Sequence, residues 1–206
     1  MTKNILIFGG SITYGAWDIT KGGWVQRLRS YLEKNHELQD YFVYNFGIPG
    51  DTSSMVLDRF ETDIKYRVDE DEENIVIFAT GTNDSAFLEK ENKQRTEIEV
   101  FKDNLEKLFN QASEYSDKII FIGLTTVNQP MVSPIPWKPN IFYNNQNILQ
   151  YNKIIKDFCQ SRNILFIDLY DKVATDNLVD GIHPDEQGHE IMFQVIKDNL
   201  IKNNII

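Results

Sequence analysis

Five short apolar runs divide the chain and predict β-strands. A run without polar alternation is typical of a strand that is buried on both faces of a parallel sheet. Between the runs, apolar residues recur at helical spacing and predict helices over 24–35, 99–115, 147–161 and 185–201, with another that carries residues 55–60. The five predicted strands lie at 5–8, 41–46, 74–80, 118–124 and 164–169.

Strands that alternate with helices indicate an α/β fold with a parallel sheet. Right-handed crossovers place helices on both faces of such a sheet, which gives a three-layer α/β/α sandwich. We expect a flavodoxin-like strand order, 2-1-3-4-5. The sequence has no internal repeat, low-complexity tract or linker, so residues 1–206 are predicted to form a single domain.

The longest irregular stretch, 125–145, holds four of the six prolines of the chain. A long loop inside a compact domain is usually functional or disordered. Its aromatic residues favour a packed lid or pocket wall over disorder. Trp137 and Phe142 are equally compatible with substrate contacts and with a small core of the lid itself.

The charge and the apolar content of the chain argue against some classes of binding partner. The formal net charge is −10, which argues against nucleic acid and anionic membranes because both require a basic face. A run of five acidic residues, 69–73, is expected to be solvated rather than to bind metal. No apolar stretch approaches 18 residues and no signal pattern opens the chain, so we expect a cytoplasmic protein without membrane insertion.

The single cysteine, Cys159, excludes an intrachain disulfide and a multi-thiolate metal site. It falls within a predicted helix. A buried structural thiol is therefore the expected role, rather than a nucleophile.

Residues that could take part in catalysis follow the predicted strands. Ser11 comes just after the first strand, Gly50 after the second and Asn83 after the third, while Asp180 and His183 follow the fifth. Ligands of open parallel sheets bind at the carboxyl ends of the strands, so these residues should meet at one edge. Taken alone, Ser11 is equally well explained as the cap of a following helix.

Together these residues are the parts of a serine hydrolase. A serine hydroxyl is a weak nucleophile until a base takes its proton, and histidine is the usual base. A carboxylate then fixes the imidazole tautomer. The spacing of Asp180 and His183 lets the aspartate reach the near ring nitrogen while the far nitrogen faces Ser11.

The same reaction needs donors for an oxyanion. The backbone N–H groups of Ser11 and Gly50 and the side-chain amide of Asn83 are the candidates. Asn83 has an alternative role, which is to hold its own turn through a local side-chain bond. Asp84 is expected to brace this loop.

Other titratable residues compete for the triad roles. Asp176 and Asp185 are alternatives to Asp180, which is favoured by its spacing to His183. His189 lies within the last predicted helix and is expected to be a surface or packing residue. His36 is expected to face solvent.

Four sequence blocks in order resemble the SGNH (GDSL) hydrolase family of esterases and acylhydrolases. The nucleophile, glycine, asparagine and acid-base blocks correspond to 9–13, 45–52, 81–84 and 180–184. The resemblance implies a three-layer α/β/α fold, no metal and no cofactor. It also implies hydrolysis of an acyl ester through an acyl-serine intermediate, with Gly50 as the oxyanion glycine.

One position departs from this pattern, because Gly10 stands where the family has an aspartate before the serine. That aspartate is not the triad acid of the family. The sequence therefore predicts a metal-independent serine esterase that acts on a small-molecule ester, with short acyl chains or acetylated sugars favoured over long-chain lipids. An acyltransferase on the same site and a catalytically silent binding module are the alternatives. The sequence does not indicate the oligomeric state.

Overall fold

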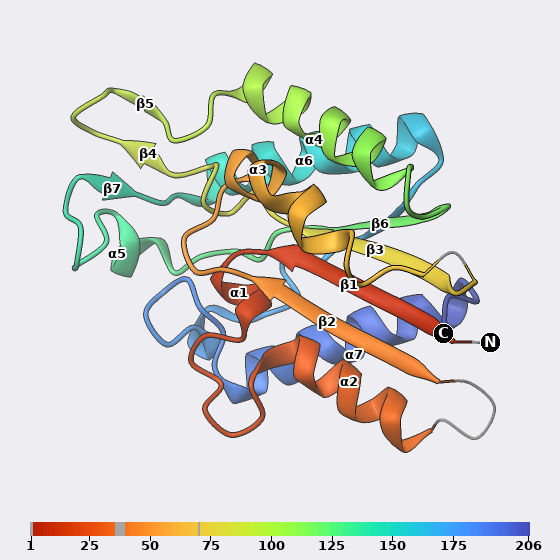
Figure 1. Ribbon diagram of the computed structural model, residues 1–206. Helices are drawn as coiled ribbons and strands as arrows, with labels where there is room; N and C mark the ends of the chain where they lie inside the picture. The colour runs from red at the N-terminus through yellow and green to blue at the C-terminus, as the bar shows by residue number, and fades with distance from the viewer. Residues whose placement is uncertain (1, 36–39, 70) are drawn as a thin grey trace.

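A five-stranded parallel sheet forms the centre of the computed structural model, which describes residues 2–35, 40–69 and 71–206 (Figure 1). The strand order is β2-β1-β3-β6-β8. In chain order these strands are the first to the fifth of the sheet, so the expected 2-1-3-4-5 arrangement is confirmed. His36 and Glu70, for which the sequence suggested solvated positions, lie outside the described residues. The strands are β1 (Lys3–Gly9), β2 (Tyr41–Gly47), β3 (Glu73–Ala79), β6 (Lys118–Ile122) and β8 (Leu165–Ile167).

Helices cover both faces of the sheet (Figure 1). One face packs against α2 (Gly23–Lys34) and α7 (Glu186–Lys202). The other packs against α3 (Ser53–Ile64), α4 (Ile98–Ala112) and α6 (Asn145–Arg162). The three-layer α/β/α prediction is therefore confirmed.

Strand β1 shows why the apolar runs became central strands. Leu6 and Phe8 belong to the α3–α4–α6 core, while Ile5 and Ile7 belong to the α2–α7 core, and all four are fully buried. Successive side chains of a strand point to opposite faces, so both faces must be apolar. Each such side chain contributes roughly 1.5 to 3 kcal/mol when it is fully buried.

The register of the sheet aligns the ends of its central strands. Gly9 at the end of β1 pairs with Gly47 of β2 on one side and with Ala79 of β3 on the other. The loops that follow these three strands therefore begin side by side at one edge of the sheet.

A second, three-stranded antiparallel sheet was not expected from the sequence. It consists of β4 (Phe87–Leu88), β5 (Lys93–Gln94) and β7 (Ile141–Phe142) in the order β5-β4-β7. With α5 (Gln129–Val132), it projects beyond the edge where β1 and β3 end (Figure 1). The stretch 125–145 is thus only partly irregular. Two-residue strands leave no hydrophobic period to detect.

The remaining short elements are α1 (Ser11–Tyr14) and the 3₁₀ helix η1 (Thr175–Asn177). Cys159 is buried in α6, where burial raises the pKa of its thiol to about 12, as expected of a structural cysteine. Within the described residues, no helix combines the length and apolarity that crossing a membrane requires.

Candidate active site

Ser11 is the first residue of α1, directly after the turn that ends β1. Gly10 occupies the N-cap position, and no side chain caps this helix. The capping alternative for Ser11 is therefore wrong. Its Oγ instead lies 2.7 Å from Nε2 of His183. Gly9 makes the turn possible, because a β-carbon there would lie 2.2 Å from Thr13 Oγ1 and 2.5 Å from the carbonyl oxygen of Ala79.

Asp180 and His183 share one tight turn. Oδ1 of Asp180 accepts the backbone N–H groups of Ile182 and His183 at 3.1 and 3.0 Å. Oδ2 lies 2.7 Å from Nδ1 of His183. Gly181 has a φ of 90°, a conformation that suits glycine. The four-residue turn therefore holds the carboxylate against both the backbone and the ring.

This turn also sets the charge of Asp180. Burial alone would raise the pKa of the carboxyl, but the hydrogen bonds from the ring and backbone of His183 and from the backbone of Ile182 lower it to about 2. The group is thus a carboxylate at neutral pH. It accepts from Nδ1–H, which leaves Nε2 of His183 as the acceptor for the Ser11 hydroxyl.

The competing carboxylates and histidine are occupied elsewhere. Asp185 caps α7 by accepting the N–H of Gly188 at 2.7 Å, and Asp176 lies in η1. His189 is fully buried, so it is a packing residue rather than a surface one. Its Nδ1 accepts the N–H of Trp24, and its Nε2–H donates to the carbonyl of Ala16.

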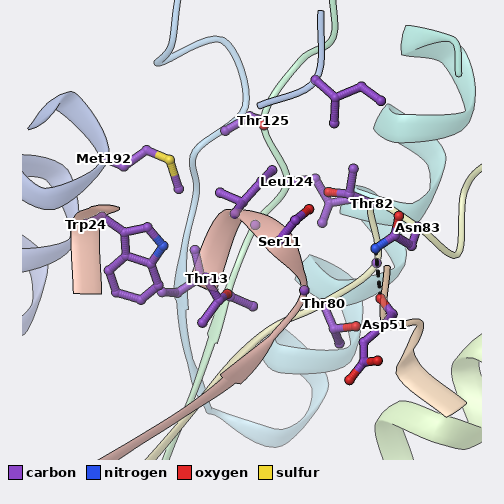
Figure 2. A pocket seen from close by; sticks show the side chains of 17 residues that line it. Ser11, Thr13, Trp24, Asp51, Thr80, Thr82, Asn83, Leu124, Thr125 and Met192 are labelled. Carbon is purple, nitrogen blue, oxygen red and sulfur yellow. Dashed lines mark hydrogen bonds between the residues drawn. The ribbon is translucent and has the colours of Figure 1, made fainter. Parts of the chain in front are cut away.

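Asn83 is held in one orientation by two contacts. Its Nδ2 donates to the backbone carbonyl of Asp51 at 2.9 Å, as drawn in Figure 2. Its Oδ1 accepts the hydroxyl of Tyr143 at 3.0 Å. A carbonyl can only accept, so Nδ2 must face Asp51. The amide retains a second N–H, and its contacts reach other loops rather than only its own turn.

Gly50 lies in the loop after β2 with a φ of 91°, and a β-carbon there would meet no atom within 4 Å. Its carbonyl accepts a hydrogen bond from Arg95 at 3.0 Å. Arg59 ties this loop to the end of β2, with bonds of 2.8 Å to the Asp51 carboxylate and 2.6 Å to the Phe46 carbonyl. Among the contacts of the described residues, none uses the N–H of Gly50.

The buried carboxyl of Asp84 braces the start of α3. Both of its oxygens lie 3.0 Å from the N–H of Ser53, and Oδ1 also accepts the Ser53 hydroxyl. Burial raises the pKa of this carboxyl. The expectation that Asp84 braces the loop is confirmed.

A cavity of about 40 Å³ lies beside Ser11. Figure 2 shows Ser11 between Asn83 and Thr82 on one side and Trp24 and Met192 on the other. The lining combines backbone of the strand ends with small and apolar side chains, among them Thr13, Thr80, Ile122, Leu124 and Ile182.

Trp137 and Phe142 do not line this cavity. Phe142 pairs with Phe87 in the small sheet, and the side chain of Trp137 is 52% exposed. Their role as substrate contacts stays a prediction.

Two residues of the site were missed by sequence reasoning. Tyr143 orients Asn83, and the indole N–H of Trp17 donates to Oδ2 of Asp180 at 3.0 Å. Neither belongs to a motif with a fixed spacing to its partner, so no local signal pointed to them.

Among the described residues, no three side chains of histidine, cysteine, aspartate or glutamate are grouped as a metal site would require.

The model of the GDSL-like lipase/acylhydrolase family matches residues 7–191. The chain belongs to this family. The match spans all four loops that converge on Ser11, with Gly10 among the matched residues. A comparison with curated proteins gave no match.

Solved structures share the fold of this family member. A lipase/acylhydrolase from Enterococcus faecalis superposes with a TM-score of 0.77 at 22% identity, covering 98% of this chain and 96% of that one. A GDSL-like lipase from Bacteroides thetaiotaomicron has a TM-score of 0.71 at 24% identity, with 97% and 88% covered. An acetylxylan esterase from Geobacillus stearothermophilus has a TM-score of 0.73 at 19% identity, with 96% and 93% covered.

Proposed function

We propose that this family member is a metal-independent serine esterase in which Ser11 is the nucleophile, His183 the base and Asp180 the acid. The observation that carries the proposal is the continuous pair of 2.7 Å contacts from Ser11 Oγ through the His183 ring to Asp180 Oδ2. This order of hydroxyl, imidazole and carboxylate is the arrangement that activates serine.

In the first half of the reaction, Ser11 Oγ attacks the ester carbonyl carbon while its proton passes to Nε2 of His183. The carbonyl oxygen becomes an oxyanion, for which the backbone N–H groups of Ser11 and Gly50 and the free N–H of Asn83 are the proposed donors. When the intermediate collapses, the bond to the alcohol oxygen breaks and His183 returns the proton to that oxygen. The acyl group stays on Ser11.

In the second half, His183 takes a proton from water, and the resulting hydroxide attacks the acyl carbonyl. Collapse of the second tetrahedral intermediate breaks the bond to Ser11 Oγ, which regains the proton from His183. Asp180 stabilises the imidazolium each time that it forms. The products are an alcohol and a carboxylic acid.

The substrate is proposed to be a short-chain acyl ester. The cavity of about 40 Å³ beside Ser11 supports this size. One water molecule needs roughly 10 to 15 Å³ of such space, so the cavity suits an acyl group of a few carbons. An acetylated sugar fits this limit because its alcohol part can remain outside the cavity.

The test is hydrolysis of p-nitrophenyl esters from acetate to palmitate by the wild type and by Ser11→Ala. We expect fastest turnover on the short esters and a fall in kcat on the order of 10⁶-fold in the variant. Wild-type turnover by Ser11→Ala would refute the mechanism, and faster hydrolysis of palmitate than acetate would refute the substrate size.

A fluorophosphonate probe and an added alcohol acceptor separate the remaining alternatives. The probe should label Ser11 of the wild type. A chain that neither turns over nor labels would be a silent binding module. Acyl transfer to the acceptor in preference to water would identify an acyltransferase.

A further inference from the structure

Trp17 contacts the triad carboxylate from outside the four family blocks. Its indole N–H donates to Oδ2 of Asp180 at 3.0 Å, the same oxygen that accepts Nδ1–H of His183. A hydrogen bond to an ionised carboxylate is stronger than one between neutral groups. The Asp180 carboxylate is thus fixed from three directions, which are the backbone of its own turn, the His183 ring and the Trp17 ring.

The backbone of Trp17 adopts a conformation that is unfavourable for a bulky residue. Its φ is 69°, in the left-handed region that bulky side chains rarely occupy. Burial does not account for it, because the side chain is 55% exposed. Strained residues of this kind persist where the surrounding structure holds them, and they cluster at functional sites.

The residues on either side of Trp17 are held firmly. The carbonyl of Ala16 accepts Nε2–H of His189 at 3.1 Å, and the backbone N–H of Ala16 donates to the carbonyl of Ser11 at 3.0 Å. On the other side, the buried carboxylate of Asp18 pairs with Arg27 at 2.8 Å and accepts the N–H of Gly23 at 3.0 Å. These contacts supply the support that the strained position requires, and they tie Trp17 to the helix that begins with Ser11.

We propose that Trp17 is a positioning residue for the triad, and that its indole N–H fixes the rotamer of the Asp180 carboxylate. This inference rests on the proposed esterase function. The Asp180 side chain must keep Oδ2 in line with Nδ1 of His183 as the ring gains and loses a proton. The second donor on Oδ2 removes the freedom of the carboxylate to rotate away, so the imidazole stays aimed at Ser11.

The sharpest test replaces Trp17 with β-(3-benzothienyl)alanine, which keeps the bicyclic shape and exchanges the N–H for sulfur. We expect kcat on p-nitrophenyl acetate to fall about tenfold with KM within twofold, because a hydrogen bond to a charged group is lost. Trp17→Phe should behave in the same way. Ile19→Ala, an exposed change in the same turn, is the matched control and should leave both constants unchanged.

Trp17→Gly separates positioning from a purely structural role. Glycine is relaxed at a φ of 69°, which offsets the stability lost with the indole hydrogen bond, so the urea midpoint of this variant should change little while its kcat falls. A structural role predicts the reverse, with a lower midpoint and an unchanged kcat for the folded enzyme. Wild-type kcat in both the benzothienyl and the Phe variants of an active enzyme would overturn the proposal.

Nuclear magnetic resonance tests the contact without relying on turnover. The indole ¹⁵N–¹H resonance assigned through Trp17→Phe should shift in Asp180→Asn, while the other tryptophan indoles stay in place. If the wild type is inactive and the fluorophosphonate probe does not label it, but the Trp17 resonance still shifts in Asp180→Asn, the esterase function is rejected and the contact between Trp17 and Asp180 is retained. If the wild type is active and the Trp17 resonance does not shift in Asp180→Asn, only the proposed role of Trp17 is rejected.

Discussion

The side-chain amide of Asn83 lies next to the position that a β-carbon of Gly10 would occupy. A β-carbon at Gly10 would be only 3.1 Å from Nδ2 of Asn83 and 3.5 Å from the carbonyl of Asp51, the group to which that amide donates. The φ of Gly10 is −98°, outside the left-handed region that favours glycine. The absence of a side chain at Gly10 therefore leaves room for the amide of Asn83.

The first prediction concerns this space. In Gly10→Ala, the new methyl group must displace the Asn83 amide by a few tenths of an ångström, and we expect kcat to fall about tenfold because oxyanion donors act only in precise alignment. Stability should change by less than about 1 kcal/mol, since the φ of Gly10 lies outside the left-handed region. Steady-state kinetics and urea unfolding measure the two quantities. An unchanged kcat would show that the amide is not needed in its present place.

The second prediction concerns the donor itself. Asn83→Ala removes an oxyanion donor and should lower kcat by about 10²- to 10³-fold. Asn83→Asp is its matched control, because it keeps the shape and replaces the donor with an acceptor. Asn83→Asp should lower kcat at least as much as Asn83→Ala does. Near-normal turnover in either variant would remove Asn83 from the proposed oxyanion site.

The third prediction concerns the tyrosine behind this donor. Burial raises the pKa of Tyr143 to about 12, so at neutral pH its hydroxyl is a neutral donor to Oδ1 of Asn83. Tyr143→Phe should leave Oδ1 of Asn83 without its donor, so that the amide is held by Asp51 alone, and should lower kcat about tenfold, the effect of roughly one neutral hydrogen bond. Combining it with Asn83→Ala should cost no more than Asn83→Ala alone. Additive losses in this double-mutant cycle would contradict the role.

The fourth prediction is a loss of stability in acid. The pKa of Asp180 is about 2 in the folded chain, below its usual value of 3.8. A lowered carboxyl pKa adds stability that is present above the unfolded pKa and is lost as the pH falls through the folded one. Asp180→Asn should therefore cost about 2 kcal/mol at pH 7, with the difference from the wild type shrinking between pH 4 and pH 2. Urea unfolding across this range measures it, and a difference that does not depend on pH would count against it.

The fifth prediction concerns His189. Burial lowers its pKa below the usual 6.5, while nearby Asp18 raises it and Arg27 lowers it further. Below pH 6.5 the unfolded chain binds a proton that the folded His189 resists, so stability should fall as the pH drops from 6.5 toward 5. His189→Gln should reduce this slope whatever its effect on absolute stability. Equal slopes in the two proteins would refute the assignment.

The sequence determined those features whose causes lie close together in the chain. The apolar run of β1 needs only its own residues to show that both faces are buried. The turn from Asp180 to His183 fits four residues, so the carboxylate, the backbone donors and the ring can be placed from their spacing. The order of the five main strands was predicted as the common flavodoxin-like arrangement of such folds, and the structure confirms it.

Only the tertiary structure decided the contacts between distant segments. His183 and Ser11 lie 172 positions apart, and Trp17 and Asp180 lie 163 apart. The sequence placed Ser11 and His183 at one edge of the sheet, but their 2.7 Å approach depends on the register of the sheet from β1 across β3 and β6 to β8. The contact of Tyr143 with Asn83 could not be predicted from the sequence. The small sheet could not be predicted either, because two-residue strands carry no hydrophobic period. Local sequence determines the long strands and helices, whereas a side-chain contact between two loops requires the whole sheet to bring them within hydrogen-bonding distance.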